Sequence, residues 1–249
     1  MSITSKSKFR TSAAGLVAVL ALSTGLLAAC TTTQAATTGN SVQDAAVAPM
    51  EEPMKHGSDH GKSDAEDAGS VAKKIALYSA MHDLWGDHMQ WTLSTVDAFF
   101  HNPDGLDANL KRLLQNQKDI GAAIVPFYGQ EAGDKLAALL TEHIEDAVPV
   151  LQAAKAGDEE ALNKGLEVWY ANAKEVAAFL TAANPEDWPA SATEPMMKGH
   201  IDQTTAYAVA LLTGDFEGAV AGYDEAKHHM LMLADILAEG LINQFPEDF

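Results

Sequence analysis

The pattern of apolar and polar positions changes sharply near residue 71. From Val71 to the C-terminus, apolar residues recur with a period near 3.6, with frequent Ala and Leu and few β-branched runs. Such a period is typical of helices with one buried face. Short segments rich in Pro, Gly, Asn and Asp divide the pattern, so it predicts six helices, at about 71–101, 106–127, 130–155, 159–182, 193–212 and 216–244. We therefore expect an all-α fold, a bundle of about six antiparallel helices.

The expected helices pair into three similar hairpins. Each hairpin has one histidine on the apolar stripe of its first helix, and these histidines are His88, His143 and His200. The last two hairpins turn at Gly-Asp pairs, and Asp158 is expected to cap the helix that follows its turn. The pattern favours three tandem hairpins. The alternative is that similar amphipathic helices align by chance.

The three histidines are the main candidates for chemistry. Histidines on facing helices of a bundle can converge on one metal ion, and imidazole suits Cu, Zn, Ni and Fe. At the position 29 residues after each histidine, the second helices carry Gln117, Asn172 and His229. We therefore predict a transition-metal site, with Cu or Zn as the expected ion, whose candidate ligands are His88, His143, His200 and His229. The alternative is three separate core histidines, each hydrogen-bonded within the protein.

Other polar and aromatic residues are weaker candidates. Three acids are possible extra ligands or partners of the histidines: Asp87, Glu142 and Asp224. The polar run at 116–119 is unusual where the second helix should pack, and is explained equally by a polar site, a network around a buried histidine or a solvated face. Four tryptophans are expected mainly in the core, with a ligand pocket as the alternative: Trp85, Trp91, Trp169 and Trp188.

The N-terminal segment has the features of an export signal. Three basic residues precede an apolar stretch from Gly15 to Leu27, which is short for a membrane span. The residues at 27–30, Leu-Ala-Ala-Cys, resemble a bacterial lipobox. That resemblance implies cleavage before Cys30, acylation of Cys30 and a lipid anchor in the bacterial envelope, in the outer membrane if the cell is Gram-negative. Ordinary cleavage near Ala29, leaving a free thiol, is the alternative.

A low-complexity segment follows the predicted cleavage site. Thr, Ala, Ser, Gly and Asp dominate residues 30–70, without hydrophobic periodicity, so we expect a flexible tether. Within it, residues 50–60 contain two Met and two His, which can hold a soft metal loosely or be an ordinary polar linker. The predicted organisation is a signal peptide at 1–29, a tether at 30–70 and a helical domain at 71–249.

Composition limits the classes of partner. The chain has 16 basic and 35 acidic residues, a formal charge of −19, and the mature chain from Cys30 has 13 basic residues and a charge of −22. So acidic a surface repels phosphate backbones, which argues against nucleic acid as a partner. It suits solubility, cations or a basic envelope protein. With one cysteine, the chain forms no internal disulfide.

Known catalytic motifs are missing from the sequence. It contains no His-Glu-x-x-His zinc-protease motif, no Gly-rich phosphate loop and no Gly-x-Ser-x-Gly elbow, and it lacks the two Glu-x-x-His motifs of the di-iron bundles. We therefore expect a binding protein more than an enzyme. The leading hypothesis is a lipid-anchored protein that binds a transition metal or small ligand through its interior histidines. The alternative is a non-enzymatic structural or interaction lipoprotein with an acidic surface that binds a partner.

A set of short motifs resembles a family of small helical bacterial proteins of uncharacterised activity. The motifs lie around Trp85 and His88, at Leu113–Gly121, around His143, at Trp169–Ala173 and at Gln244–Pro246. Together they span nearly the whole predicted domain. The resemblance implies one coherent helical domain and adds no activity.

Overall fold

A computed structural model describes residues 60–249, with side chains from Asp67 onward. Within that range the chain is helical throughout and contains no strand. Six long helices are joined by short turns: α1 (His60–His101), α2 (Pro103–Ala123), α4 (Gln130–Ala156), α5 (Glu159–Ala183), α6 (Ala190–Thr213) and α7 (Phe216–Gln244). Two short elements complete the fold, the single turn α3 (Val125–Tyr128) and the 3₁₀ turn η1 (Pro246–Asp248).

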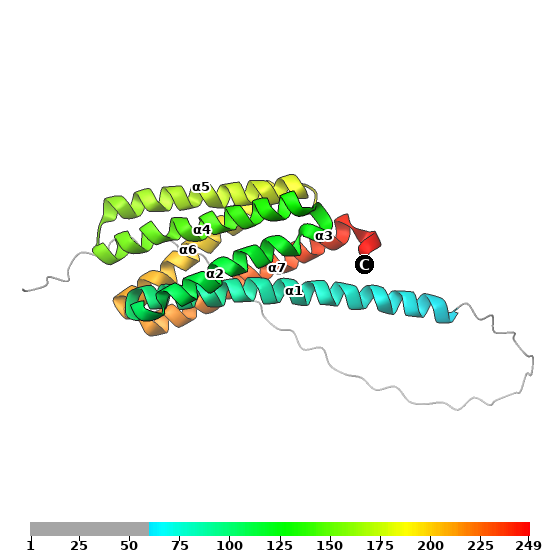
Figure 1. Ribbon diagram of the computed structural model, residues 1–249, viewed down its shortest axis with the longest axis horizontal. Helices are drawn as coiled ribbons and strands as arrows, with labels where there is room; N and C mark the ends of the chain where they lie inside the picture. The colour runs from blue at the N-terminus through cyan, green and yellow to red at the C-terminus, as the bar shows by residue number, and fades with distance from the viewer. Residues whose placement is uncertain (1–59) are drawn as a thin grey trace, which may run out of the picture. The chain divides into compact units, whose positions relative to one another are not determined.

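The six long helices form a closed ring. Helices α1 and α2, α4 and α5, and α6 and α7 pack as antiparallel hairpins, and each hairpin packs on the next through α2 with α4 and α5 with α6. The ring closes because α7 packs on α1 (Figure 1). An all-α bundle of six antiparallel helices, built from three consecutive hairpins, is therefore confirmed. This arrangement places the first helices α1, α4 and α6 at alternate positions around one interior.

Helix boundaries agree closely with the local sequence signals. Gly157 and Gly214 end their helices at φ values of 68° and 79°, a left-handed conformation that glycine adopts without a Cβ clash. The Asp158 side chain accepts a hydrogen bond from the backbone of Ala161, which confirms the predicted cap, and Asp215 does the same for Gly218.

Two boundaries differ from prediction. Helix α1 begins at His60, so residues 60–70 are helical and were wrongly assigned to the tether. Adding turns to an existing helix needs no new nucleation, so the helix continues even through Gly61 and Gly69. The predicted helix at 106–127 is two helices, because α2 ends before Pro126, which has no backbone N–H to continue the hydrogen-bond ladder. Pro149 and Pro195, by contrast, lie inside α4 and α6.

The buried apolar side chains of the six long helices form one core inside the ring. Helices α2 and α4 approach closely at two glycines: a Cβ on Gly121 would lie 2.5 Å from the carbonyl oxygen of Gly133, and one on Gly133 would lie 2.7 Å from that of Gly121. A hydrogen bond from the Lys73 side chain to the Asp248 carbonyl links α1 to the C-terminal turn, and the first turns of α1 project beyond this contact (Figure 1). No described helix is both long enough and apolar enough to span a bilayer.

Candidate functional site

Three of the four predicted ligands meet inside the ring. His88 from α1, His143 from α4 and His200 from α6 are each at most 2% exposed. The ring centroids of His88 and His200 are 5.4 Å apart, and those of His143 and His200 are 5.6 Å apart. The closest approach is 3.4 Å, between the Nε2 atoms of His88 and His200. The helical ring thus brings together histidines that are more than 50 residues apart in sequence.

Amide side chains from the second helices orient two of the histidines. Asn172 donates to the carbonyl oxygen of Leu139 at 3.1 Å, so its Oδ1 is free to accept from Nδ1 of His143 at 2.9 Å. His143 therefore has its proton on Nδ1, and its Nε2 is buried with a lone pair and no partner. A carbonyl acceptor on the far nitrogen is the usual way that proteins orient a metal-binding imidazole.

In the first hairpin two adjacent residues divide these roles, and the atom that faces the histidine is an amide nitrogen, which donates, rather than an oxygen. Asn116 donates to the carbonyl of Leu84 at 2.9 Å, and Nε2 of Gln117 lies 3.4 Å from Nδ1 of His88. Both amides are fully buried, so residues 116 and 117 form a network around a buried histidine, one of the alternatives left open by the sequence. Lys118, by contrast, points to solvent. The Oε1 atom of Gln117 is buried without a partner.

His229 lies outside the histidine cluster. Its Nε2 lies 2.8 Å from the carbonyl oxygen of Met196, so that nitrogen holds a proton and donates it. The side chain is half-buried, against Gly199, whose Cβ position would lie 3.2 Å from the imidazole. The structure therefore does not place His229 beside His200 in the way that Asn172 lies beside His143. As a result, Nδ1 of His200 is buried without a partner.

Each of the three hairpins nevertheless contains an equivalent hydrogen bond between its two helices. In each hairpin, a side chain from the second helix donates to the backbone carbonyl four residues before the histidine of the first helix. The donor–acceptor pairs are Asn116 with Leu84, Asn172 with Leu139 and His229 with Met196. This contact supports the alignment of the hairpins, and it shows why His229 is unavailable to the cluster: the shared carbonyl bond takes its Nε2.

Burial keeps the cluster neutral. Desolvation lowers the pKa of His88 to about 3, helped by the neighbouring His143 and opposed by the hydrogen bond with Gln117. Desolvation lowers the pKa of His143 to about 4, against the effect of its hydrogen bond with Asn172. The pKa of His200 falls well below 6.5 because of desolvation and then the nearby histidines, His88 first. Neutral imidazole is the form that binds metals, so all three side chains are in that form at neutral pH.

A small cavity adjoins the three histidines. Its volume is about 50 Å³, and its lining includes the three imidazoles together with Trp169, Thr204 and several aliphatic side chains. The indole nitrogen of Trp169 and the hydroxyl of Thr204 are buried without a hydrogen-bond partner. The hydroxyls of Thr204 and Tyr207 lie near each other without hydrogen-bond geometry. For Trp169, the sequence pattern favoured the core and left a ligand pocket as the alternative.

The distance between His88 and His200 is long for a hydrogen bond and equals the spacing of two imidazole ligands on one ion. Two imidazole nitrogens bound at 2.0–2.1 Å to a tetrahedral ion lie about 3.3–3.4 Å apart. An N–H donor normally lies about 2.7–3.2 Å from its acceptor. However, in the part of the chain that the structure describes, no group of three or more His, Cys, Asp or Glu side chains is already arranged around a metal position. The His143 ring is stacked on His200 at 25°, and has to turn before its Nε2 completes the set.

The other predicted site residues lie elsewhere. Asp87 forms an ion pair with Arg112 at 2.6 Å, at the surface of the bundle. Glu142 and Asp224 are exposed. None of these acids reaches the histidines as a ligand or partner. Cys30 and the Met- and His-containing run at 50–60 lie outside the residues that the structure describes in side-chain detail.

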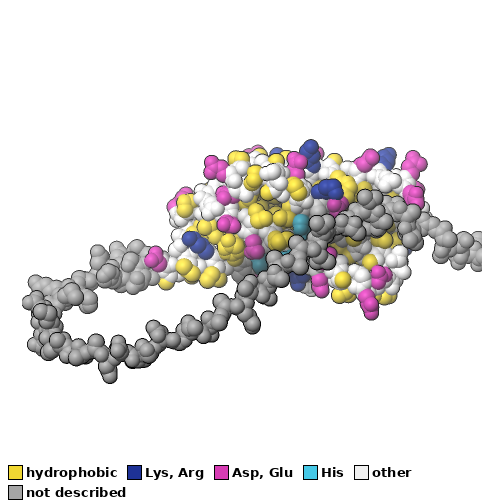
Figure 2. Space-filling view, turned by 180° about the vertical axis from the view of Figure 1, so that it is seen from behind, with side chains coloured by type: hydrophobic (Ala, Val, Ile, Leu, Met, Phe, Trp, Pro, Cys, Tyr) yellow, Lys and Arg dark blue, Asp and Glu magenta, His cyan; other side chains and the backbone are white. Residues whose placement is uncertain are grey.

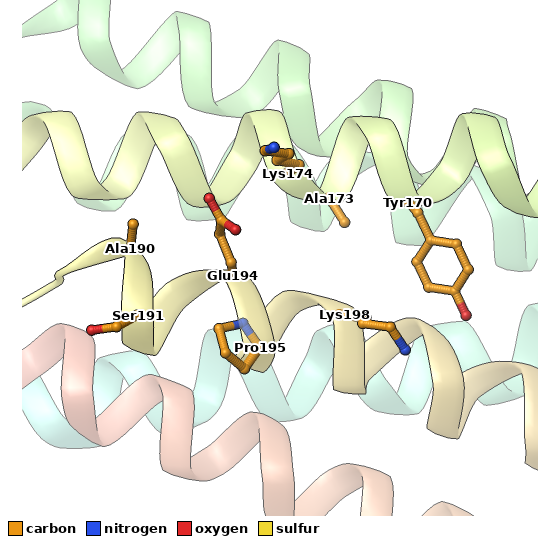
Figure 3. A pocket seen from close by; sticks show the side chains of 8 residues that line it. All are labelled: Tyr170, Ala173, Lys174, Ala190, Ser191, Glu194, Pro195 and Lys198. Carbon is orange, nitrogen blue, oxygen red and sulfur yellow. The ribbon is translucent and has the colours of Figure 1, made fainter.

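A larger hollow lies on the surface between α5 and α6 (Figure 3). Its volume is about 460 Å³, and Tyr170, Lys174, Glu194 and Lys198 are among the residues that line it. The Lys198 ammonium is already paired with Asp202 at 2.6 Å, and Tyr170 donates to the same carboxylate. The hollow is open and its charged side chains are exposed, so the buried histidine cluster is the stronger candidate site.

Comparisons with known proteins do not extend the assignment. No protein-family model matches the chain, and searches of curated proteins and of solved structures found no match.

Proposed function

We propose that this protein is a lipid-anchored protein of the bacterial envelope whose helical domain binds one transition-metal ion between His88, His143 and His200. The observation that carries the proposal is the 3.4 Å separation of the His88 and His200 Nε2 atoms in a fully buried, neutral cluster. The free Nε2 of His143 supplies the third ligand once the ring turns, and the Asn172 side chain has to move with the ring to keep its bond to Nδ1. Cu and Zn are the ions that this all-imidazole set suits best.

Unpartnered polar atoms support a bound ion over a purely structural cluster. Buried polar groups in proteins are nearly always hydrogen-bonded. Here Nε2 of His143, Nδ1 of His200 and Oε1 of Gln117 all lack partners. An ion uses the lone pair on His143. It also requires a lone pair on Nε2 of His88. The proton of His88 then moves to Nδ1, and the Gln117 amide turns so that its unpartnered Oε1 accepts that proton in place of Nε2. In a purely structural cluster, the buried histidine nitrogens and the amide oxygen would all have hydrogen-bond partners.

The decisive experiment measures metal content. The mature chain with Cys30→Ser, which purifies without acyl chains, is loaded with Zn²⁺ or Cu²⁺, dialysed and analysed by mass spectrometry of the elements. We expect one ion per chain, lost in His200→Gln and retained in His229→Gln, the matched control outside the cluster. Circular dichroism checks that both variants fold. A folded parent chain that holds no ion after loading refutes the proposal.

The anchor is tested separately. Acylation of Cys30 adds enough buried methylene groups for stable membrane attachment. The wild-type chain is expected in the membrane fraction and Cys30→Ala in the soluble fraction, with a mass difference equal to the lipid. A wild-type chain without that added mass rules out the lipoprotein assignment and leaves the metal proposal unaffected.

On the face shown in Figure 2, no single acidic patch marks a place where a basic partner would bind. Acidic side chains are scattered over the face shown in Figure 2, among apolar and basic ones, and do not gather in one patch there. Salt-sensitive binding to a basic envelope protein, with a metal-free domain, is the result that favours this alternative.

A further inference from the structure

The cavity beside the histidines has hydrogen-bond donors with nothing to bind. Trp169 and Thr204 both line it, both are nearly fully buried, and their Nε1–H and Oγ1–H groups have no acceptor. The other two threonines in the lining differ: Thr92 donates to the carbonyl of His88 at 2.6 Å, and Thr95 donates to that of Trp91 at 2.7 Å. Two donors are therefore left for an occupant of the cavity that accepts hydrogen bonds.

The charge of a bound ion points to the same kind of occupant. Three neutral imidazoles leave the charge of a divalent ion uncompensated. The cavity lining contains no carboxylate, and no Asp, Glu, Lys or Arg is among the buried residues of the described chain. An isolated charge in a low-dielectric interior is strongly unfavourable unless an opposite charge accompanies it.

Resting on the proposed metal site, we infer that the ion takes a small monovalent anion as its fourth ligand, held in the cavity by the Trp169 indole and the Thr204 hydroxyl. The volume of about 50 Å³ limits the anion to a few atoms, the size of hydroxide or azide. The anion compensates one of the two positive charges of the ion and supplies an acceptor for the two cavity donors. Larger carboxylates and sugars do not fit this space.

The test uses the mature Cys30→Ser chain loaded with Co²⁺, whose visible absorption reports its ligands. Titration with sodium azide is expected to change the spectrum with saturation. Thr204→Val and Trp169→Phe each remove one donor, so each is expected to weaken azide binding by about tenfold or more, without loss of Co²⁺. Thr95→Val is the matched control: it changes the same cavity by the same atoms, but its hydroxyl is already used, so azide affinity should stay within about twofold.

The outcomes separate this inference from the metal proposal. If the folded parent chain takes up no Co²⁺, the metal site itself is wrong. If Co²⁺ binds and azide leaves its spectrum unchanged, the metal site stands and the anion site is overturned. If azide binds equally well to the parent and to both donor variants, the cavity donors are wrongly assigned. Thermal unfolding of each variant confirms that it is folded.

Discussion

The neutral histidine cluster should make the metal-free protein strongly sensitive to mild acid. The perturbation is a change of pH from 7.5 to 5 in the presence of a chelator, on the mature Cys30→Ser chain. An unfolded histidine has a pKa near 6.5, so it is almost fully protonated at pH 5. In the folded chain the pKa is lowered to about 3 for His88 and about 4 for His143, and is well below 6.5 for His200.

The sign and size of the effect follow from these values. Because the folded pKa values are lowered, the unfolded chain binds more protons than the folded chain below pH 6.5, so stability falls as the pH falls. The stabilisation is fully present above pH 6.5, and it is lost progressively toward the folded pKa values. At pH 5 His88 and His143 each lower the free energy of unfolding by about 2 kcal/mol, so the two together lower it by about 4 kcal/mol. The lowered pKa of His200 adds to the loss in the same direction. That loss is comparable with the whole stability of many domains.

Urea unfolding at a series of pH values measures this directly. The free energy of unfolding is expected to fall steeply between pH 6.5 and 5, above the range in which most carboxylates are protonated. Replacing His88 or His143 with Gln removes one titrating group, so the fall should become about 2 kcal/mol smaller in each variant. The change per pH unit can be compared between variants even if each variant is less stable overall.

A shallow pH dependence would refute the reasoning. If the parent chain loses less than about 2 kcal/mol between pH 7.5 and 5, the three imidazoles are not all held neutral by burial. Water in the interior, or an open form of the ring, is then present in solution. If the loss is steep but the Gln variants do not reduce it, other groups are responsible.

Two further substitutions test how the cluster is held. Asn172→Leu keeps the side-chain volume but removes the partners of His143 Nδ1 and of the Leu139 carbonyl. It should lower the free energy of unfolding, measured by urea unfolding, by about 2–4 kcal/mol. It should also weaken metal binding, measured by competition with a chelator, by about 10- to 100-fold. An unchanged metal affinity would show that His143 is not a ligand. Gly121→Ala places a Cβ 2.5 Å from a backbone carbonyl oxygen of α4, so α4 has to move. The substitution should therefore lower the melting temperature by several degrees. An unchanged melting temperature would show that α2 and α4 are less closely packed.

The sequence predicted the helices well because the signals for them are local. The period of 3.6, the Gly-Asp turns and the capping aspartates act within a few residues, and they located the last four long helices to within about three residues at each end. The start of α1 was missed because residues 60–70 have no apolar stripe and contain weak helix formers such as Gly61 and Gly69. The break before Pro126 was missed for the opposite reason, since the apolar pattern continues across it.

The sequence alone also placed His88, His143 and His200 on apolar stripes at equivalent positions. A stripe shows that a side chain faces inward, but it does not give the distance to another helix or say which nitrogen is free. Only the closed ring, completed by α7 packing on α1, set the 3.4 Å approach of two imidazoles. The same packing turned His229 to the Met196 carbonyl and left the cavity donors unpartnered, because the register between helices depends on contacts across the whole ring.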